Sequence, residues 1–553
     1  MKASNKLRIG LLVDDFIIPY WAYSIVEKIE SSEFAEIVLV VKKRKSSVKT
    51  IWQKARNSLP VLFYKIFRQL ESYFFKVSPY AFERKDLRTL ISIAKVFEVD
   101  CIEKKYSDYV TEDQVKEIKD FHVDVFIRFG FRILRGEMLK TAKYGIWSYH
   151  HGDNAVNRGG PAGFWEVMRR EREVGSILQI LTEDLDGGHV LARSWSGIHR
   201  LLTPTVNAYF WKSSTFILRN LKELYEFGGE AFMEKIRLEN DRLNFYSHPL
   251  YTIPRNLQFL ILVFSNVWNW AKLNCWKLLN FEQWILLYAF DQRGITTSIF
   301  KYKRITPPKD RFWADPCVIF DNNKFYIFLE EFIYKEKRGH ISVIELNKNG
   351  IPGNPKVILE KSYHLSYPFV FKYQDNYYMI PETSENSTIE LYQARDFPYK
   401  WEFRMNLIEN IRAFDTTLLI KDNKFWLFTN LKDIDGASPS EELFLFMSDN
   451  LFSNTWEQHP CNPIVSDVKS ARPAGRMFYH NGKLYRPSQD CSYKYGYSTV
   501  INEVQILNEK EYKEYKISEI SPKWAKDVVA THTISFDQDL SVIDASINRK
   551  KFT

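Results

Sequence analysis

The feature that most constrains the fold is an internal repeat in the second half of the chain. Beyond about residue 295, a tight-turn signal followed by an aromatic strand recurs four times. The copies are Asp321-Asn-Asn-Lys-Phe-Tyr-Ile-Phe328, Gln374-Asp-Asn-Tyr-Tyr-Met-Ile380, Lys421-Asp-Asn-Lys-Phe-Trp-Leu-Phe428 and His480-Asn-Gly-Lys-Leu-Tyr485. Each copy predicts a β-hairpin, because Asn and Gly tolerate the positive φ that tight hairpin turns require.

A short strand with small or polar residues precedes each turn, and a fifth copy without the turn signal follows near the C-terminus. One polar residue of each copy is taken as equivalent: Asp315, Ser366, Asp415, Arg472 and His532. Their spacings of 51, 49, 57 and 60 residues suit four-stranded propeller blades. Five copies predict a five-bladed β-propeller over 283–553. A generic β-sandwich is the alternative, disfavoured because its strands do not repeat in such blocks.

The first half of the chain has a different pattern, in which short apolar runs are separated by helix-like segments. The runs are residues 8–13, 36–41 and 124–128. Strand, helix and strand in succession are typical of a parallel α/β sheet. Between the second and third runs, a basic and aromatic stretch at 42–100 has apolar residues at helical spacing and predicts an inserted helical hairpin. The expected domains are 1–225, a helical linker 226–282, and 283–553.

Composition narrows the classes of function and location. The chain of 553 residues has 77 Lys and Arg against 68 Asp and Glu, without a basic stripe interleaved with aromatics, so nucleic-acid binding is not expected. No apolar core of a signal peptide is recognisable at the N-terminus, which favours a cytoplasmic location. An apolar stretch at 257–264 predicts either a core helix or an interfacial helix in peripheral contact with a membrane. The sequence does not indicate an oligomeric state.

The densest chemistry in the first half lies within residues 144–161 and 175–191. His150 stands at the predicted end of a strand, and Asp186 precedes a glycine pair. A carboxylate at this separation can face the histidine across neighbouring strands and raise its basicity, so that the imidazole can take a proton from an amine. A purely structural hydrogen bond between the two side chains is the alternative, and the residues alone leave both open.

This segment resembles the catalytic segment of the formyltransferase family, which includes methionyl-tRNA, glycinamide ribonucleotide and nucleotide-sugar N-formyltransferases. The matching positions are Gly145, His150, Arg158, Gly159, Asp186 and Gly188. The resemblance covers about residues 7–225 and implies a Rossmann-like domain in which 10-formyltetrahydrofolate meets an acceptor amine. It also implies that His150 acts as a base or stabilises the tetrahedral intermediate, while Asp186 orients it.

The segment departs from the family at two places. Ser148 stands where the family has its catalytic Asn, and losing an oxyanion donor typically costs about 10²–10³ in rate. The loop that follows differs as well and carries Asp153 and Asn154. A different acyl donor, a site rebuilt by these two residues, or a non-catalytic domain all remain open. The residues expected at the site are Ser148, His150 and Asp186 for catalysis, with Asp153, Asn154, Arg158 and Gly159 for binding.

The repeat region resembles the five-bladed propellers of glycoside hydrolase family 43. It resembles still more closely the N-terminal module of plant glucosamine inositolphosphorylceramide transferases. The segments that carry this likeness are Phe312-Trp-Ala-Asp-Pro, Leu365-Ser-Tyr-Pro, Ile380-Pro-Glu-Thr and Arg486-Pro-Ser-Gln-Asp490. The hydrolases imply a general-base role for Asp315, whereas Glu382 and Asp415 do not match the usual acid clearly.

Innermost propeller strands line a central channel, so the equivalent polar residues are expected at its mouth. The expected glycan-binding residues are Asp315, Glu382, Asp415, Arg472, Arg486, Asp490 and His532. Arg472, Arg486 and Asp490 form a charged set that would suit an anionic sugar or phosphate. The alternative is that the aspartates merely cap blade turns.

Together the two halves predict a multidomain enzyme, with an α/β Rossmann-like formyltransferase domain followed by an all-β five-bladed propeller. The expected function is transfer of a formyl or related acyl group to an amino sugar or nucleotide-linked amino sugar in surface-glycan biosynthesis, with a glycan bound at the propeller. The alternative is a glycan-binding, glycosyl-transferring or glycosidase-like propeller protein, in which the formyltransferase-like domain is a non-catalytic scaffold.

Overall fold

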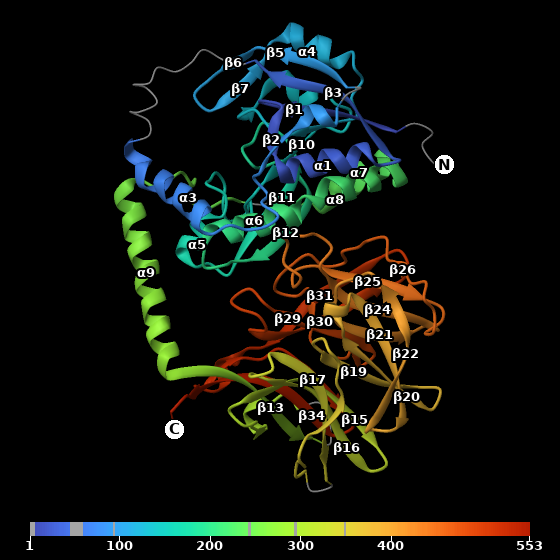
Figure 1. Cartoon of the computed structure of the whole chain (residues 1–553). Coiled ribbons are helices and arrows are strands. Elements are labelled where there is room, and N and C mark those ends of the chain that lie inside the picture. Colours follow the sequence, from blue (N-terminus) through green and yellow to red (C-terminus); the bar gives the residue numbers. More distant parts are fainter. Residues whose placement is uncertain are drawn as a thin grey trace. The chain divides into compact units, whose positions relative to one another are not determined.

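The computed structural model describes residues 6–44, 59–91, 94–241, 245–291, 296–347 and 350–552 (Figure 1). The chain divides into two compact units. Unit 1 comprises Met1–Val267 with Ile434–Ser438, and unit 2 comprises Trp268–Asp433 with Pro439–Thr553. Each unit has its own sheets and hydrophobic core.

Unit 1 is built on a seven-stranded sheet in the order β12-β11-β10-β8-β1-β3-β5. Its strands are β1 (Leu7–Val13), β3 (Ala35–Lys43), β5 (Lys95–Val99), β8 (Val125–Arg128), β10 (Ile146–His150), β11 (Glu173–Ile180) and β12 (His189–Gly197). The strands from β10 to β5 pair in parallel, whereas β11 is antiparallel to both of its neighbours. The three strands predicted from the apolar runs are confirmed, and the result is a mixed α/β sheet.

Helices cover both faces of this sheet, which explains why its central strands are apolar throughout. They are α1 (Tyr20–Glu30), α4 (Glu112–Lys119), α5 (Phe164–Arg169), α6 (Leu202–Ser213), α7 (Thr215–Phe227) and α8 (Gly229–Glu239). One core cluster joins α1, α5, α6 and α7 to one face of the sheet, with Trp147 and Phe164 fully buried in it. A second cluster joins α4 to the other face.

The predicted helical insertion is only partly present in the described residues. The helix α3 (Leu62–Phe74) lies within the predicted insertion, and residues 45–58, on which the hairpin prediction also falls, lie outside the described part of the chain. Both ends of the predicted insertion belong to strands instead. Strand β3 extends to Lys43. Strand β5 begins at Lys95, because the alternating Lys-Val-Phe-Glu-Val segment is suited to a strand. The linker region contains α8 and then α9 (Asn256–Leu279), and the next strand begins at Asn280.

Unit 2 consists of five successive antiparallel sheets. Sheet 1 contains β15 (Arg311–Asp321), β16 (Lys324–Ile333), β17 (Arg338–Leu346) and β18 (Lys356–Leu359); sheet 2 contains β19 (Ser366–Tyr373), β20 (Asn376–Glu382), β21 (Thr388–Asp396) and β22 (Lys400–Glu409). Sheet 3 contains β23 (Ala413–Lys421), β24 (Lys424–Leu431), β25 (Leu443–Ser448) and β26 (Glu457–Gln458); sheet 4 contains β27 (Arg472–Pro473), β28 (Phe478–His480), β29 (Lys483–Asp490), β30 (Ser498–Leu507) and β31 (Tyr512–Ile520).

The fifth sheet joins the two ends of this unit. It contains β13 (Asn280–Phe290), β14 (Lys303–Ile305), β32 (Val528–Ala530), β33 (Ile534–Asp537) and β34 (Leu540–Lys550). Strand β13 pairs with β34 over eleven residue pairs. The first strands of successive sheets contact one another, and the backbone N–H of Ile534 donates to the carbonyl oxygen of Ala474, which completes the ring. Unit 2 is therefore a five-bladed β-propeller, as the repeat predicts.

The hairpin signals are also confirmed by the backbone. Asn322 and Asn323 have φ of 47° and 66°, and Asp422 and Asn423 have φ of 53° and 58°. Two consecutive residues with positive φ are typical of the tight turns whose twist matches that of the flanking strands. The Asn and Asp residues of the repeat therefore stand where the turn chemistry requires them.

Candidate functional site

The first strand of three blades contains a β-bulge at the same position. The bulge changes the direction in which the side chain of the bulged residue points. Asp315, Tyr367 and Asp415 have φ of 53°, 43° and 50°, each at a shift of strand register. Tyr367 is therefore the equivalent of Asp315, whereas Ser366 takes the place of Ala314. The equivalence of Ser366 expected from the sequence was wrong by one residue. A bulge re-aims a side chain, and here it brings both aspartates into buried contacts.

A second set of polar residues lies on the strand that pairs with the first strand of four blades, three of which carry the bulge. Glu330, Glu382, Asn430 and Gln489 occupy equivalent places, six residues into the aromatic strand of the repeat. All four are buried. Only Glu382 was expected from the sequence, although the alignment of the four aromatic strands contained the signal for the other three. We call the buried residues Asp315, Glu330, Glu382, Asp415, Arg472, Gln489, His532 and Asp544 the polar ring.

His532 lies between two carboxylates of the polar ring. Its Nε2 is 3.1 Å from Asp315 Oδ1, and its Nδ1 is 2.8 Å from Asp544 Oδ2. Asp544 also accepts the backbone N–H of Asp315 at 2.9 Å. Burial alone would lower the pKa of His532, but Asp544 and Asp315 outweigh it and raise that pKa to about 10. At neutral pH this side chain is therefore an imidazolium held by two anions.

Arg472 forms the second ion pair of the polar ring. Its Nε donates to Asp415 Oδ2 at 2.6 Å and its Nη2 to Oδ1 at 3.1 Å, a bidentate geometry. Gln489 donates to the same carboxylate at 2.9 Å, while Glu382 accepts the backbone N–H of Asp415 at 3.3 Å. Burial, with Asp415 nearby, raises the pKa of Glu382 well above its usual range, while Arg472 Nη2, 3.6 Å from Glu382 Oε2, acts in the opposite direction.

One three-ligand group suited to a metal ion occurs among the described residues. Asp315, His532 and Asp544 offer ligand atoms that lie within 4.8 Å of one another. A metal ligand must be a neutral imidazole, whereas His532 holds a proton between its two partners. The imidazolium thus supplies positive charge between these two carboxylates.

Aromatic side chains adjoin the polar ring and reach solvent. The Tyr495 ring centroid lies 4.9 Å from the guanidinium carbon of Arg472 and 5.6 Å from the ring centroid of His532. Tyr495 is 47% exposed. The Trp284 ring lies 4.1 Å from that of His532. An exposed aromatic face beside buried polar groups is suited to stacking against a sugar ring.

Two of the expected propeller residues do not join the polar ring. Arg486 is fully buried, and its Nε donates to Glu514 Oε2 on β31 at 2.7 Å. Asp490 accepts the backbone N–H of Ser492 at 2.8 Å, which is the capping role left open by the sequence. Arg472 and Arg486 are each paired with a carboxylate, so the structure does not bring together the anion-binding set expected from the sequence.

The structure does bring together the histidine and aspartate predicted in unit 1. His150 Nδ1 lies 3.5 Å from Asp186 Oδ2. His150 Nε2 lies 2.7 Å from the carbonyl oxygen of Asn157, and because a carbonyl only accepts, this nitrogen carries a proton. Ser148 is buried on the same strand, where its Oγ accepts from Arg128 Nε at 2.9 Å.

The loop after His150 is organised around Asp186. Asn154 Nδ2 donates to the Asp186 carbonyl at 3.0 Å, and Arg158 Nε donates to the Asn154 carbonyl at 2.9 Å. The Asp153 carboxylate instead accepts from Arg193 and, at 3.0 Å, from Trp195 Nε1. Gly159 has φ of 99°, and a Cβ there would overlap the carbonyl oxygen of Tyr251, so only glycine fits. The four expected binding residues therefore shape one loop.

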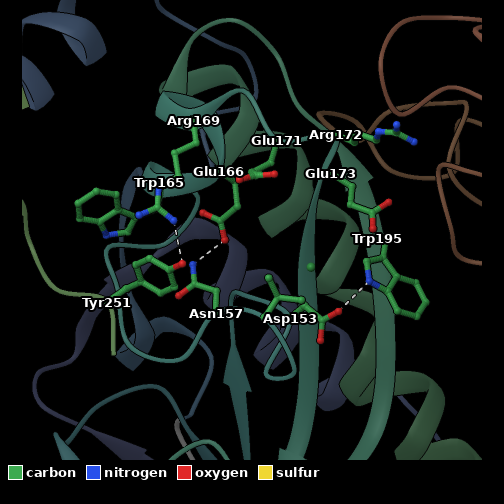
Figure 2. Close-up of a pocket in the computed structure, with 12 residues that line it drawn as sticks. Asp153, Asn157, Trp165, Glu166, Arg169, Glu171, Arg172, Glu173, Trp195 and Tyr251 are labelled. Carbon is green, nitrogen blue, oxygen red and sulfur yellow. Dashed lines mark hydrogen bonds between the residues drawn. The ribbon is translucent and has the colours of Figure 1, made fainter. Parts of the chain in front are cut away.

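A cavity of about 280 Å³ opens beside this loop (Figure 2). Asn157 Nδ2 donates to Glu166 Oε1 at 2.6 Å. Glu166 Oε2 and Asn157 Oδ1 are buried and have no hydrogen-bond partner among the described residues. Burial raises the pKa of Glu166. Figure 2 shows Trp165, Arg169 and Tyr251 on one side of the cavity and Trp195 on the other. Sequence reasoning missed Glu166, which no motif marks.

Comparisons with known proteins place the strongest similarity in the propeller. Residues 301–535 match the family described as glucosamine inositolphosphorylceramide transferase 1, N-terminal. The rice protein of that name (Oryza sativa subsp. japonica) is 34% identical over 210 residues, or 37% of this chain and 28% of the relative. The Arabidopsis thaliana protein is 31% identical over 209 residues, or 37% and 27%. The chain thus spans less than a third of the length of these relatives.

Solved structures similar to this chain include glycoside hydrolases. A family 117 hydrolase from Zobellia galactanivorans has 11% identity and a TM-score of 0.32, and the match covers 48% of this chain and 90% of that one. RS223-β-xylosidase has 15% identity and a TM-score of 0.30, with coverage of 38% and 77%.

The family match at 301–535 includes Asp315, Asp415, Arg472 and His532. The polar ring therefore lies largely within the segment that resembles the N-terminal part of named transferases.

Proposed function

We propose that the protein acts in glycan biosynthesis and that its propeller recognises a sugar beside the polar ring. The observation that carries this proposal is the half-exposed Tyr495 ring, which lies beside Arg472 and His532 in the segment similar to the transferases. The polar ring itself is buried, and each of its two cations is paired with a carboxylate. We therefore assign it recognition and orientation of a sugar rather than acid–base cleavage.

The charge of the polar ring favours a cationic sugar over an anionic one. Among the described residues, the aspartates Asp315, Asp415 and Asp544 pair with two cations, Arg472 and His532. Burial raises the pKa of Glu330 and Glu382 well above the usual range. A protonated amino sugar suits such surroundings, and glucosamine appears in the name of the relatives. This reading replaces the anionic sugar expected from the sequence.

Replacing Tyr495 by alanine is expected to weaken glucosamine binding by about two- to tenfold, because stacking of this kind contributes about 0.5–1.5 kcal/mol. Saturation-transfer NMR on the full chain with glucosamine as the probe measures it. Tyr515→Ala is the matched control, since Tyr515 is similarly exposed but lies on the outer strand β31. Equal losses in the two variants, or no binding by the wild type, would contradict the proposal.

A second candidate function is acyl transfer to an amino sugar in unit 1. The observation that favours it is a pair of buried oxygens without a hydrogen-bond partner among the described residues, Glu166 Oε2 and Asn157 Oδ1, on two residues that line the cavity of Figure 2. Such oxygens suit the donors of an amine or a hydroxyl. For a 10-formyltetrahydrofolate donor, which would supply the formyl group, His150 and Asp186 fit the expected pair by distance. Ser148 does not fit the oxyanion-donor role, because its buried hydroxyl already donates to the Tyr149 carbonyl oxygen at 3.3 Å.

Isothermal titration with a stable folate analogue of the formyl donor tests this second candidate. Micromolar binding by the wild type and at least about tenfold weaker binding by His150→Ala or Asp186→Ala would support it. Glu166→Gln should leave folate binding unchanged and weaken binding of glucosamine at the cavity. If folded protein releases or absorbs no heat when the folate analogue is added, formyl transfer is excluded. The proposal for the propeller does not depend on this result.

A further inference from the structure

Two helices of this protein carry large apolar side chains that nothing in the described structure covers. On α3 these include Ile66, Leu70 and Phe74, and on α9 they include Ile261, Phe264 and Trp268. Their exposed fractions lie between 44% and 73%. The residues recur every three or four positions, so each set forms one stripe along its helix. A soluble protein rarely leaves contiguous apolar surface of this size uncovered.

The faces of α3 and α9 opposite to the apolar stripes make contacts within the protein. Phe67 and Phe259 pack together with their ring centroids 5.3 Å apart. Glu71 is buried, and its carboxylate accepts from the backbone N–H of Leu202 at 2.7 Å. The Asn256 side chain accepts from the backbone N–H of Phe63 at 3.1 Å, joining the start of α9 to the start of α3 (Figure 1). The apolar stripes are therefore held outward rather than loosely placed.

The exposed charged side chains of both helices are basic. Helix α9 contains Lys272 and Lys277 and no acidic residue, and both lysines are exposed. Arg255 precedes it and is also exposed. The one acidic residue of α3, Glu71, is buried. An apolar stripe with Trp and Phe beside exposed lysines is the composition of helices that lie in a membrane interface.

We propose that α3 and α9 form a docking surface for an anionic lipid bilayer. The apolar stripes enter the boundary between headgroups and acyl chains, while the lysines contact acidic headgroups. No helix in the described part of the chain is long and apolar enough to cross a membrane. The surface thus holds the protein on a bilayer. The charge pattern favours this occupant over a second copy of the chain, whose identical lysines would face like charges.

Flotation of the full chain with vesicles tests the docking surface. Vesicles of phosphatidylglycerol with phosphatidylcholine should carry the wild type, and those of phosphatidylcholine alone should carry less. The triple variant Ile261→Ser, Phe264→Ser, Trp268→Ser should lose about 100-fold or more in partitioning, because three large apolar side chains are removed. Lys272→Gln with Lys277→Gln should lose about tenfold, on anionic vesicles only.

A matched triple variant controls for general loss of apolar surface. Tyr479→Ser, Tyr515→Ser and Ile517→Ser remove exposed side chains of the propeller and should leave flotation unchanged. Circular dichroism checks that every variant remains folded. The proposal fails if the wild type stays in the bulk fraction, or if the α9 triple variant floats like the wild type. It also fails if sedimentation shows a dimer that this triple variant abolishes, since the stripes would then bind a second copy.

Discussion

Replacing Arg472 by methionine is expected to lower the free energy of unfolding of the propeller by about 3–5 kcal/mol, because it leaves a buried carboxylate without its counter-ion. Asp415 accepts two hydrogen bonds from this guanidinium and is almost fully buried. Gln489 alone cannot replace the lost charge. Hydrogen exchange on peptides from β23 and β24 measures the change within the propeller, separately from unit 1.

The control for this variant is an exposed pair on the same propeller. Arg395 lies 2.6 Å from Glu402, with both side chains more than half exposed. Arg395→Met should change the free energy of unfolding by less than about 1 kcal/mol, because water screens such a pair. Similar protection losses in the Arg395 and Arg472 variants would show that the buried ion pair has no special role in stability.

Replacing His532 by glutamine is expected to destabilise the propeller by about 3–5 kcal/mol at neutral pH, because Asp315 and Asp544 lose the cation between them. The effect should depend on pH. The pKa of His532 is raised from 6.5 to about 10 in the folded protein, so its contribution is complete below pH 6.5 and is lost as the pH rises through about 10.

The pH dependence separates the charge of His532 from its packing. Between pH 6.5 and 10 the wild type should lose stability faster than His532→Gln, so the two curves should converge at the alkaline end. His480→Gln, which alters an exposed histidine on β28, should follow the wild type throughout. Parallel curves for the wild type and His532→Gln would mean that no titrating charge is involved.

The propeller was predictable from the sequence because its repeat combines two independent signals. The turn residues Asn322, Asn323 and their equivalents require positive φ, and the aromatic strands after them align without gaps. The bulge was not predictable. Asp315 and Tyr367 have positive φ because a bulge occurs at their positions. Neither residue type indicates positive φ in a sequence, whereas glycine does. The one-residue error at Ser366 has this cause.

The candidate site in unit 1 was partly predictable. The meeting of His150 and Asp186 follows from the order of motifs along the chain, and the structure confirms it. The engagement of His150 Nε2 by the Asn157 carbonyl depends on a loop path that no periodicity encodes. Glu166 was missed because one glutamate in a short helix has no distinguishing neighbours in the sequence, and its significance comes only from burial.

The pairing of β13 with β34 has a consequence for synthesis of the protein. Four of the five sheets contain only neighbouring segments and can form while the chain leaves the ribosome, but β13 must wait for residues 540–550. Before β34 is made, the edge of β13 that will pair with it is unpaired, and the strand contains the apolar run Trp-Ile-Leu-Leu-Tyr-Ala-Phe. Such edges template aggregation. A chain that stalls or is cut before β34 is therefore exposed to misassembly, even though most of its propeller is already made.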